Sequence, residues 1–408
     1  MWGSRRGEFK VEKDVLLIAH FCSDFDDKGN NRFNYLANLL SQNECDVEIV
    51  TTDFSHSRKN RRSETENLFS YRITMLHEPG YQKNVSLKRF YSHYIMGKNL
   101  KKYLKIRKKP DVIYCAVPSL DVAKVAAEYT KKNNIRFIID VQDLWPECFK
   151  MVFNVPVISD VLFFPMKKQA DYIYAAADEI IAVSQTYADR ALKVNKKCKE
   201  AYSIFLGTEL ASFDRLAQDN KLMDKPKDEI WLAYIGTLGY SYDLIGVIDA
   251  LKILQDKRIK NIKFVVMGDG PLKSKFENYA KKQGIYATFT GRLDYGKMVG
   301  ILTACDIAVN PIKSGSAGSI INKAGDYAAA GLPVINTQEC PEYRNLVDEY
   351  QMGLNCENSN AQDLAEKIIM LCNNEILRKT MGKNNRRLAE ERFDREKSYR
   401  KILELLED

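Results

Sequence analysis

The sequence predicts an α/β protein made of two successive doubly wound, Rossmann-like domains. Apolar runs typical of buried parallel strands alternate with segments of helical periodicity along the chain. One charged stretch with little apolar content, residues 214–228, interrupts the alternation, and we expect an interdomain connection or a surface loop there. A chain of 408 residues also exceeds one ordinary domain. Ligands of such folds bind at the carboxyl ends of strands, so we expect the functional site in a cleft between the domains.

The first half consists of strand–helix–strand units. The apolar run Asp14–His20 predicts a buried strand, Arg32–Gln42 carries apolar residues at helical spacing, and Asp46–Thr52 predicts the next strand. The same alternation then predicts strands Asp111–Cys115, Arg136–Asp140, Asp178–Val183 and Ala201–Phe205, with helices Leu120–Lys132 and Gln185–Leu192.

The second half repeats this pattern from a strand at Ile230–Ile235. Further strands are expected at Lys263–Met267, Ala287–Thr290, Asp306–Asn310 and Pro333–Ile335, and helices at Leu244–Gln255, Leu272–Gln283, Lys323–Ala330 and Ala361–Asn373. We therefore expect an N-terminal Rossmann-like domain at 1–206 and a C-terminal Rossmann-like domain at 207–388. A terminal helix at 389–408 is expected to pack back on the N-terminal domain.

Composition narrows the class of protein. Lys and Arg number 62 against 54 Asp and Glu, a net charge of +8, and the 45% apolar content excludes disorder, coiled coil and collagen. Nine cysteines are scattered singly, so we expect free thiols in a reducing compartment and neither disulfides nor a zinc site. No stretch has the roughly 18 apolar residues that cross a membrane, and no targeting segment is visible. We expect a cytoplasmic protein.

Glycine-bearing turns at strand ends are candidates for phosphate binding. Gly268-Asp-Gly-Pro271 separates a predicted strand from a helix, and Gly29 precedes the first helix. Each could hold a diphosphate through backbone N–H groups or serve only as a turn, because neither motif is complete. A loop of small residues, 314–319, leads into the helix that carries Asp326. That acid could bind a ribose hydroxyl or complement the helix dipole.

One segment carries the most specific resemblance to a known family. Asp140-Val-Gln-Asp143-Leu-Trp-Pro-Glu147 resembles the D-x-W-P-E segment of family-4 retaining glycosyltransferases, in the branch that builds bacterial capsule, O-antigen and exopolysaccharide repeat units. Further blocks match in family order at 176–184, 207–209, 236–239, 267–271 and 326–334. The similarity implies GT-B architecture, in which two Rossmann-like domains face each other across a cleft.

The resemblance also implies a reaction. It implies metal-free transfer of a sugar, with retention of configuration, from a nucleotide diphosphate sugar to a lipid-linked oligosaccharide. No cofactor is expected, and UDP is favoured over GDP. Asp143 and Glu147 are the polar candidates for catalysis on the acceptor side. The residues expected around the donor are Gly29, Gly236, Thr237, Gly268, Gly291, Arg292, Leu293, Ser319, Ile320 and Asp326.

The charged groups of the donor site depart from the family pattern. Aligned through Ala-Ala-Gly-Leu-Pro, the first acid of the family's E-x(7)-E pattern falls on Gly318 and the second on Asp326. The Arg and Lys that clamp the donor diphosphate fall near Thr237 and Asp243. Lys323 is the nearest cation in the donor loop, and we expect it to take over that catalytic role as a point charge. The alternative is a solvated helix residue.

The excess of cations is concentrated at residues 81–110, which hold ten Lys or Arg and no acid. Aromatic side chains lie among these cations, which predicts contact with an anionic membrane surface, at the inner face of the cell membrane. A solvated helix face is the alternative, and no nucleic-acid partner is expected because no such fold signature accompanies the cations. Apolar residues at 152–166 could enter lipid or belong to the core.

Two other functions fit parts of the sequence. A nucleotide-sugar epimerase shares the two-domain architecture but needs acids and a histidine in the cleft. The four histidines, at 20, 56, 77 and 93, all precede residue 100, and among them His20 alone ends a predicted strand. A catalytically weakened nucleotide-sugar-binding subunit would account for the missing acid and cation pair.

Overall fold

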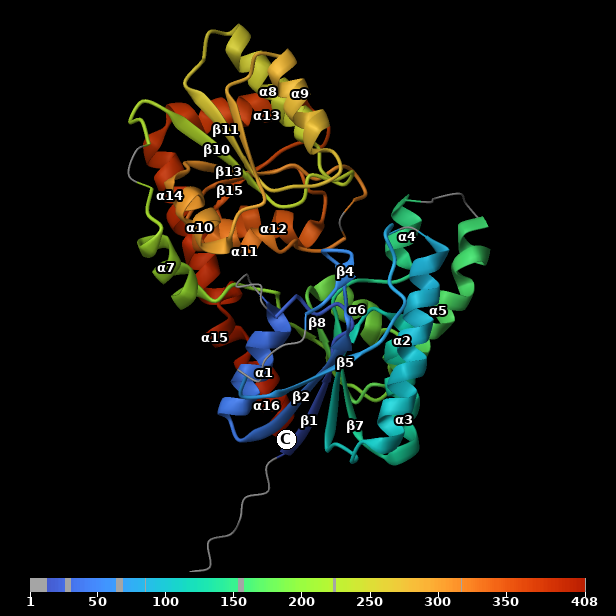
Figure 1. Ribbon diagram of the computed structural model, residues 1–408. Helices are drawn as coiled ribbons and strands as arrows, with labels where there is room; N and C mark the ends of the chain where they lie inside the picture. Colours follow the sequence, from blue (N-terminus) through green and yellow to red (C-terminus); the bar gives the residue numbers. More distant parts are fainter. Residues whose placement is uncertain are drawn as a thin grey trace, which may run out of the picture.

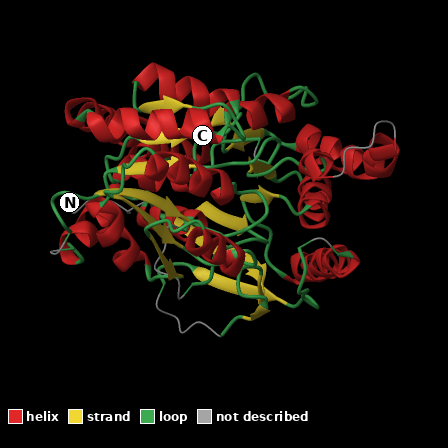
Figure 2. Cartoon of the chain, turned by 90° about the horizontal axis from the view of Figure 1, so that it is seen from above, coloured by secondary structure: helices red, strands yellow, loops and turns green. Residues whose placement is uncertain are grey.

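The computed structural model describes residues 13–25, 31–63, 69–84, 86–152, 158–222, 225–316 and 318–407. These residues form two halves, each built on a parallel sheet between layers of helices (Figure 1, Figure 2). The predicted fold of two doubly wound α/β units is confirmed.

The N-terminal half holds a seven-stranded parallel sheet of order β5-β2-β1-β6-β7-β8-β9. Its strands are β1 (Lys13–Ile18), β2 (Cys45–Thr52), β5 (Arg72–Leu76), β6 (Val112–Val117), β7 (Arg136–Val141), β8 (Glu179–Ala182) and β9 (Tyr202–Ser203). The helices are α1 (Arg32–Gln42), α2 (Leu87–Ile106), α3 (Leu120–Asn133), α4 (Glu147–Val152), α5 (Ile158–Ala176) and α6 (Gln185–Leu192). A short antiparallel hairpin, β3 (Phe54–Ser55) and β4 (Asn60–Arg61), follows β2.

The C-terminal half holds a six-stranded parallel sheet of order β12-β11-β10-β13-β14-β15. Its strands are β10 (Ile230–Ile235), β11 (Ile262–Met267), β12 (Ala287–Gly291), β13 (Ile307–Asn310), β14 (Val334–Asn336) and β15 (Gly353–Asn355). Its helices are α8 (Leu244–Asp256), α9 (Lys273–Lys282), α10 (Tyr295–Ala304), α11 (Lys323–Ala329), α12 (Pro341–Tyr350), α13 (Ala361–Asn373) and α14 (Glu375–Leu388).

The expected surface connection at 214–228 is wrong in its first part. Helix α7 (Leu210–Asp219) extends to Asp219, and its buried residues Leu210 and Phe213 belong to a core cluster of the C-terminal half. The buried anchors of this helix precede the charged stretch, and within it only Leu216 and Ala217 pack against the same cluster, so the composition of 214–228 did not reveal the helix. A helix persists through charged residues where one face is buried.

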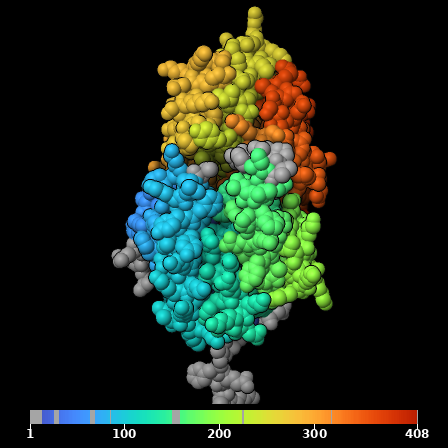
Figure 3. Space-filling model, turned by 90° about the vertical axis from the view of Figure 1, so that its right-hand side faces the viewer, coloured from blue at the N-terminus to red at the C-terminus, as the bar shows by residue number. Residues whose placement is uncertain are grey.

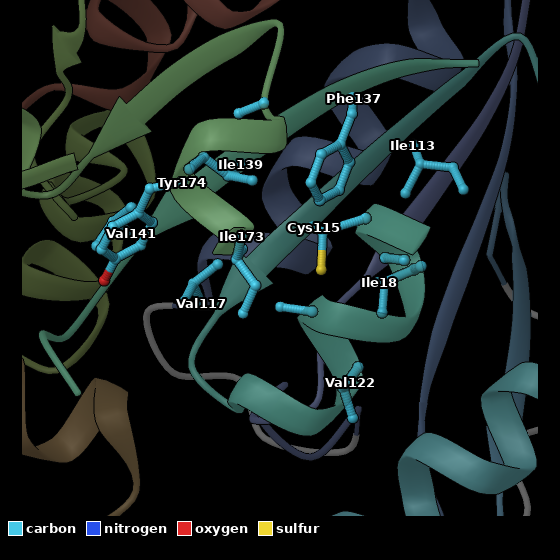
Figure 4. Close-up of a cluster of buried hydrophobic side chains, with 14 of the residues drawn as sticks. Ile18, Ile113, Cys115, Val117, Val122, Phe137, Ile139, Val141, Ile173 and Tyr174 are labelled. Carbon is cyan, nitrogen blue, oxygen red and sulfur yellow. The ribbon is translucent and has the colours of Figure 1, made fainter. Parts of the chain in front are cut away.

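Each sheet has an apolar core on both faces. In the N-terminal half, one cluster packs β6 and β7 against α3 and α5, and Ile113, Phe137 and Ile173 are fully or almost fully buried in it (Figure 4). Burying such side chains gives about 1.5–3 kcal/mol each relative to leaving them in water. The strands are apolar on both faces, as parallel strands covered by helices must be.

The C-terminal residues cross back to the N-terminal half. After α14 the chain forms a π-helical turn (Ala389–Phe393), α15 (Arg395–Ser398) and α16 (Arg400–Glu407), which lies beside α1 (Figure 1). Tyr399 and Ile402 are buried in the same cluster as Val15 of β1.

The buried guanidinium of Arg32 connects the C-terminal segment with the residues that join the two halves. Arg32 donates from Nε to Asp140 Oδ2 at 2.8 Å and from Nη1 to the Phe205 carbonyl and the Tyr399 hydroxyl. Arg395 also donates to the Leu206 carbonyl. The junction between the two halves is therefore held by hydrogen bonds from both ends of the chain.

Candidate functional site

Three of the predicted glycines meet at the carboxyl ends of neighbouring strands in the C-terminal half. The Gly236 N–H donates to the Met267 carbonyl at 2.9 Å, and the Gly268 N–H donates to the Gly291 carbonyl at 3.0 Å. A Cβ atom on Gly268 would lie 1.8 Å from the Gly236 carbonyl oxygen. Glycine is therefore required for these turns to pack together; Gly236 is exposed, Gly268 half-buried and Gly291 buried, and together they form one edge of a candidate site.

Lys323, the first residue of α11, extends toward this edge. Its Nζ lies 4.0 Å from the ring centroid of Tyr234 and 3.9 Å from that of Tyr242, and it has no hydrogen-bond partner among the described residues. A Cβ atom on Gly236 would lie 3.3 Å from the same Nζ. The side chain is 7% exposed, and burial holds the pKa of Lys323 well below its usual range. Lys323 is thus not the solvated helix residue that was the alternative.

Asp326 lies one turn further along α11. Its Oδ1 accepts a hydrogen bond of 2.7 Å from the Tyr295 hydroxyl. Burial raises the pKa of Asp326 to about 6, an effect that the Tyr295 hydrogen bond and the nearby Arg395 oppose. The carboxylate is therefore costly to keep ionised in this protein without a ligand.

The remaining predicted donor residues lie around this pair with different exposures. Ile320 is buried, and the Ser319 carbonyl accepts a 2.6 Å hydrogen bond from Gln338, which also accepts one from Asn310. The Thr237 carbonyl accepts a 2.7 Å bond from Tyr234. Arg292 is exposed, Leu293 packs against the core, and Gly29 lies outside the described residues.

Asp143 follows β7 and reaches the donor loop through a tyrosine. The Tyr187 hydroxyl donates to Asp143 Oδ1 at 3.4 Å, and the same hydroxyl lies 3.6 Å from where a Cβ of Gly318 would be. Burial raises the pKa of the Asp143 carboxyl. The position of the family's missing acid, Gly318, is therefore next to an acid–tyrosine pair from the other half of the molecule.

Glu147 is engaged elsewhere. Its Oε1 accepts a 2.5 Å hydrogen bond from Arg190 of α6, and Arg190 also binds Asp171 of α5 at 2.7 Å. The structure thus places Glu147 in an ion-pair network that joins three helices. Asp143 is the predicted acceptor-side acid that contacts the donor loop through a hydrogen-bonded partner.

Several residues of this site were not predicted. Tyr187, Tyr234 and Tyr295 supply the hydroxyls and rings that hold the charged groups, and a Cβ on Gly291 would lie 3.3 Å from the Nζ of Lys273. Lys273 begins the helix after the Gly268 turn, a position that favours an anion, and this was an available signal. The three tyrosines have no comparable local pattern, because a tyrosine within a predicted strand or helix usually packs in a hydrophobic core.

Matches to known families cover most of the chain. Residues 29–199 match the family model described as Glycosyltransferase Family 4, and residues 217–388 match the one described as Glycosyl transferases group 1. Each half of the chain thus matches a glycosyltransferase family model, and each match covers less than half of the 408 residues. The uncharacterized glycosyltransferase MJ1069 of Methanocaldococcus jannaschii is 29% identical over 255 residues, which are 60% of this chain and 62% of that relative. The matched part thus spans less than two thirds of the relative's length.

Solved structures agree with this assignment at the level of the fold. Sucrose-phosphate synthase from Thermosynechococcus elongatus superimposes with a TM-score of 0.76 and 19% identity, covering 97% of this chain and 98% of the other. HepE of Anabaena in complex with UDP-glucose gives a TM-score of 0.66 and 14% identity over 97% and 99% of the two chains. The chain therefore has the GT-B arrangement of two Rossmann-like halves.

The described residues contain neither a cluster of metal-ligating side chains nor a helix that could span a membrane. Within the described ranges, no group of three or more His, Cys, Asp or Glu side chains is placed to hold a metal ion. Among the helices described, none is both long and apolar enough to span a bilayer.

Proposed function

We propose that this protein transfers a sugar, with retention of configuration, from a nucleotide diphosphate sugar to a lipid-linked oligosaccharide or polysaccharide precursor. The observation that carries the proposal is Lys323, whose buried Nζ has no partner among the described residues and faces the glycine edge at Gly236. A buried unpaired cation is costly, and a phosphate group beside it offsets that cost. The site is therefore built for an anion that the protein itself does not supply.

The donor would lie along the carboxyl edge of the C-terminal sheet. Its diphosphate would rest on the turn at Gly236 with Lys323 beside it, and its ribose would meet Asp326. The backbone of residues 291–293 would hold the base. HepE, which shares the fold, has been crystallised with UDP and with UDP-glucose, and this favours UDP over GDP as the nucleotide here.

Lys323 would act mainly on the departing diphosphate. As the bond to the sugar breaks, negative charge grows on the leaving oxygen, and a fixed ammonium group in a site with little water stabilises that charge. The diphosphate can itself remove the proton of the acceptor hydroxyl. Asp143, held by Tyr187 against the donor loop, would orient that hydroxyl.

A lipid-linked acceptor requires the enzyme to reach a membrane surface. Large apolar side chains are exposed on the first turns of α2 and α5, which share one face of the N-terminal half (Figure 3). They are Leu87, Phe90, Tyr91, Tyr94, Ile158, Val161, Leu162 and Phe164. Phe149 of α4 lies between the two helices, with ring centroids 6.0 Å from both Phe90 and Phe163. This apolar patch and the basic turns of α2 support peripheral attachment at the inner face of the cell membrane.

One of the ten predicted cations has another role. Arg107 is almost buried and forms ion pairs with Asp14 at 2.6 Å and Glu48 at 2.7 Å. The exposed lysines on the same part of the chain are Lys101, Lys102, Lys105, Lys108 and Lys109. These five are the cations available to an anionic surface at that end of α2.

Turnover with defined substrates tests the proposal. UDP-sugars are incubated with the protein, with and without a polyprenyl diphosphate sugar, and released UDP and the extended acceptor are measured. Transfer requires both substrates. Conversion of the donor without acceptor would indicate an epimerase, and UDP binding without turnover would indicate a binding subunit; either result would refute sugar transfer.

Co-sedimentation with vesicles tests the membrane part. We expect binding that requires anionic lipid, weakens with salt, and falls when the five exposed lysines become Gln. The matched control is the neutralisation of Lys281 and Lys282, a basic pair on α9 in the other half. Vesicle binding that depends on neither the lipid charge nor the salt concentration would refute an electrostatic contact.

A further inference from the structure

A second pocket lies in the N-terminal half, away from the glycine edge. It has a volume of about 550 Å³ and is bounded by the β3–β4 hairpin on one side and by residues 79–88 on the other. The hairpin follows β2, and residues 79–88 follow β5. Because β2 and β5 are parallel neighbours, both walls rise from the carboxyl edge of the sheet, the same edge that Asp143 follows.

The lining of this pocket is strongly basic. Lys59, Arg61, Lys83 and Lys88 line it, and no acidic side chain of the described residues does. Arg61 is neutralised by Asp53 at 2.5 Å. Lys83 and Lys88 are exposed, and neither forms an ion pair within the part of the chain that is described. A pocket of this volume is large enough for a diphosphate and part of an attached group.

Lys59 and Arg89 place positive charge next to the ring of Tyr81, which lines the pocket. The Nζ of Lys59 lies 4.6 Å from the ring centroid of Tyr81, and the guanidinium of Arg89 lies 5.7 Å from the same ring. Burial and the neighbouring Arg89 lower the pKa of Lys59 to about 8. The Arg89 Nε is buried and, among the residues described, has no hydrogen-bond partner.

One buried acid, Glu78, acts on Lys59 and partly offsets the effect of burial on its pKa. Glu78 already binds His20 at 3.1 Å and Ser92 at 2.7 Å, and it is 1% exposed. Its charge is therefore used inside the protein. Lys59 and Arg89 form a pair of like charges whose mutual repulsion an external anion would relieve.

Stacked side chains connect the pocket with the segment that carries Asp143. The Arg89 guanidinium lies 4.7 Å from the ring of Trp145, two residues after Asp143. His93 stacks on the Trp145 ring, with the two ring centroids 5.7 Å apart. Arg89 thus joins Tyr81, which lines the pocket, to the segment that carries Asp143.

We propose that the pocket lined by Lys59, Lys83 and Lys88 binds the phosphate or diphosphate group of the acceptor. This inference rests on the proposed sugar transfer, because it assigns the two ends of one acceptor: the reacting hydroxyl at Asp143 and the anionic end in the pocket. Lysine, a point charge on a flexible stem, suits a phosphate group whose exact orientation varies between acceptors.

Inorganic diphosphate is the probe, titrated by calorimetry into the full-length protein saturated with UDP, so that the donor site is filled. Lys83→Gln/Lys88→Gln is expected to weaken diphosphate binding at least tenfold. The control, Lys131→Gln/Lys132→Gln, removes an exposed basic pair at the end of α3 and is expected to leave it within twofold. UDP affinity should be equal in all three proteins. Equal diphosphate affinity in all three, or none in the wild type, would overturn the proposal.

Further binding experiments distinguish acceptor binding in the pocket from binding of a lipid surface. They also distinguish a failure of the pocket proposal from a failure of the proposed sugar transfer. A short-chain prenyl diphosphate sugar should bind more weakly to the Lys83/Lys88 variant, whereas the same sugar without its diphosphate should bind both proteins equally. If anionic vesicles bind through Lys83 and Lys88 but inorganic diphosphate does not, the pocket is part of the membrane surface and the proposal is wrong. Binding needs no turnover, so a protein that binds diphosphate in this way but transfers no sugar refutes only the proposed function. Transfer to a phosphate-free acceptor at an unchanged KM refutes only the pocket.

Discussion

Asp326→Asn should make the protein more stable at neutral pH while it impairs donor binding. In the folded protein the pKa of Asp326 is raised to about 6 from an ordinary value of 3.8, chiefly by burial. Between these two values the folded state binds more protons than the unfolded chain, so stability falls as pH rises from about 4 to about 6. Above pH 7 the cost of the buried charge is fully present, and two pKa units correspond to about 3 kcal/mol.

Asparagine removes this cost and keeps an oxygen that accepts from the Tyr295 hydroxyl. We expect the melting temperature of the variant to exceed that of the wild type by roughly 5 °C at pH 8, and the difference to disappear near pH 4. The control is Asp256→Asn, an exposed acid of α8 whose replacement should give no such pH-dependent gain. UDP affinity should fall about tenfold or more, since a hydrogen bond to a charged group contributes roughly 1.5–3 kcal/mol.

Two results would refute this reasoning. A variant less stable than the wild type at pH 8 would mean that the ionised carboxylate is compensated within the protein. Unchanged UDP affinity in the folded variant would remove Asp326 from the donor site, and Asp326→Ala serves as a second test of that point.

Three other predictions use the same site. Lys323→Met should lower kcat more than donor affinity and leave the protein without ligand at least as stable, because it removes a buried unpaired charge; wild-type kinetics would exclude Lys323 from the reaction. Gly268→Ala should destabilise the C-terminal half by about 3 kcal/mol or more in denaturant melts, whereas Gly239→Ala, whose Cβ would meet its nearest neighbour at 3.5 Å, should not; equal stability of the two would contradict the close packing of the turns. Asp143→Asn should reduce turnover more than Glu147→Gln, which should mainly weaken the ion pairs of Arg190 and lower stability slightly; the opposite order of activities would make Glu147 the acceptor-side acid.

The strands with long apolar runs were predictable because each carries its own local pattern, whereas the edge strands β5 and β15 were not predicted. Apolar runs such as Val112–Val117 are buried on both sides, and the sequence pattern reports this directly. The β3–β4 hairpin was not predicted, because its strands have two residues each and Arg61 of β4 is held by the distant Glu78 carbonyl. Helix α7 was missed because its buried anchors, Leu210 and Phe213, precede the charged stretch.

The site was predictable in its backbone and less so in its side chains. Glycine turns at strand ends have a local signature, and Gly236, Gly268 and Gly291 do meet. The environment of a charged side chain is set by residues far away in the sequence: Asp326 depends on Tyr295, and Lys323 on Tyr234. Neither dependence has a local pattern.

Side chains from distant parts of the sequence occupy the positions where the resemblance to family-4 glycosyltransferases leads one to expect charged residues. Where an acid is expected, Gly318 leaves room for the Tyr187 hydroxyl, which is held by Asp143 from the opposite half. Where a cation pair is expected, a single ammonium group is held against two tyrosine rings, which attract a cation through their faces. In both places a tyrosine holds a charged group at the cleft. Because Asp143 belongs to one half and Gly318 to the other, the Tyr187–Asp143 pair links the two halves beside the loop that precedes α11.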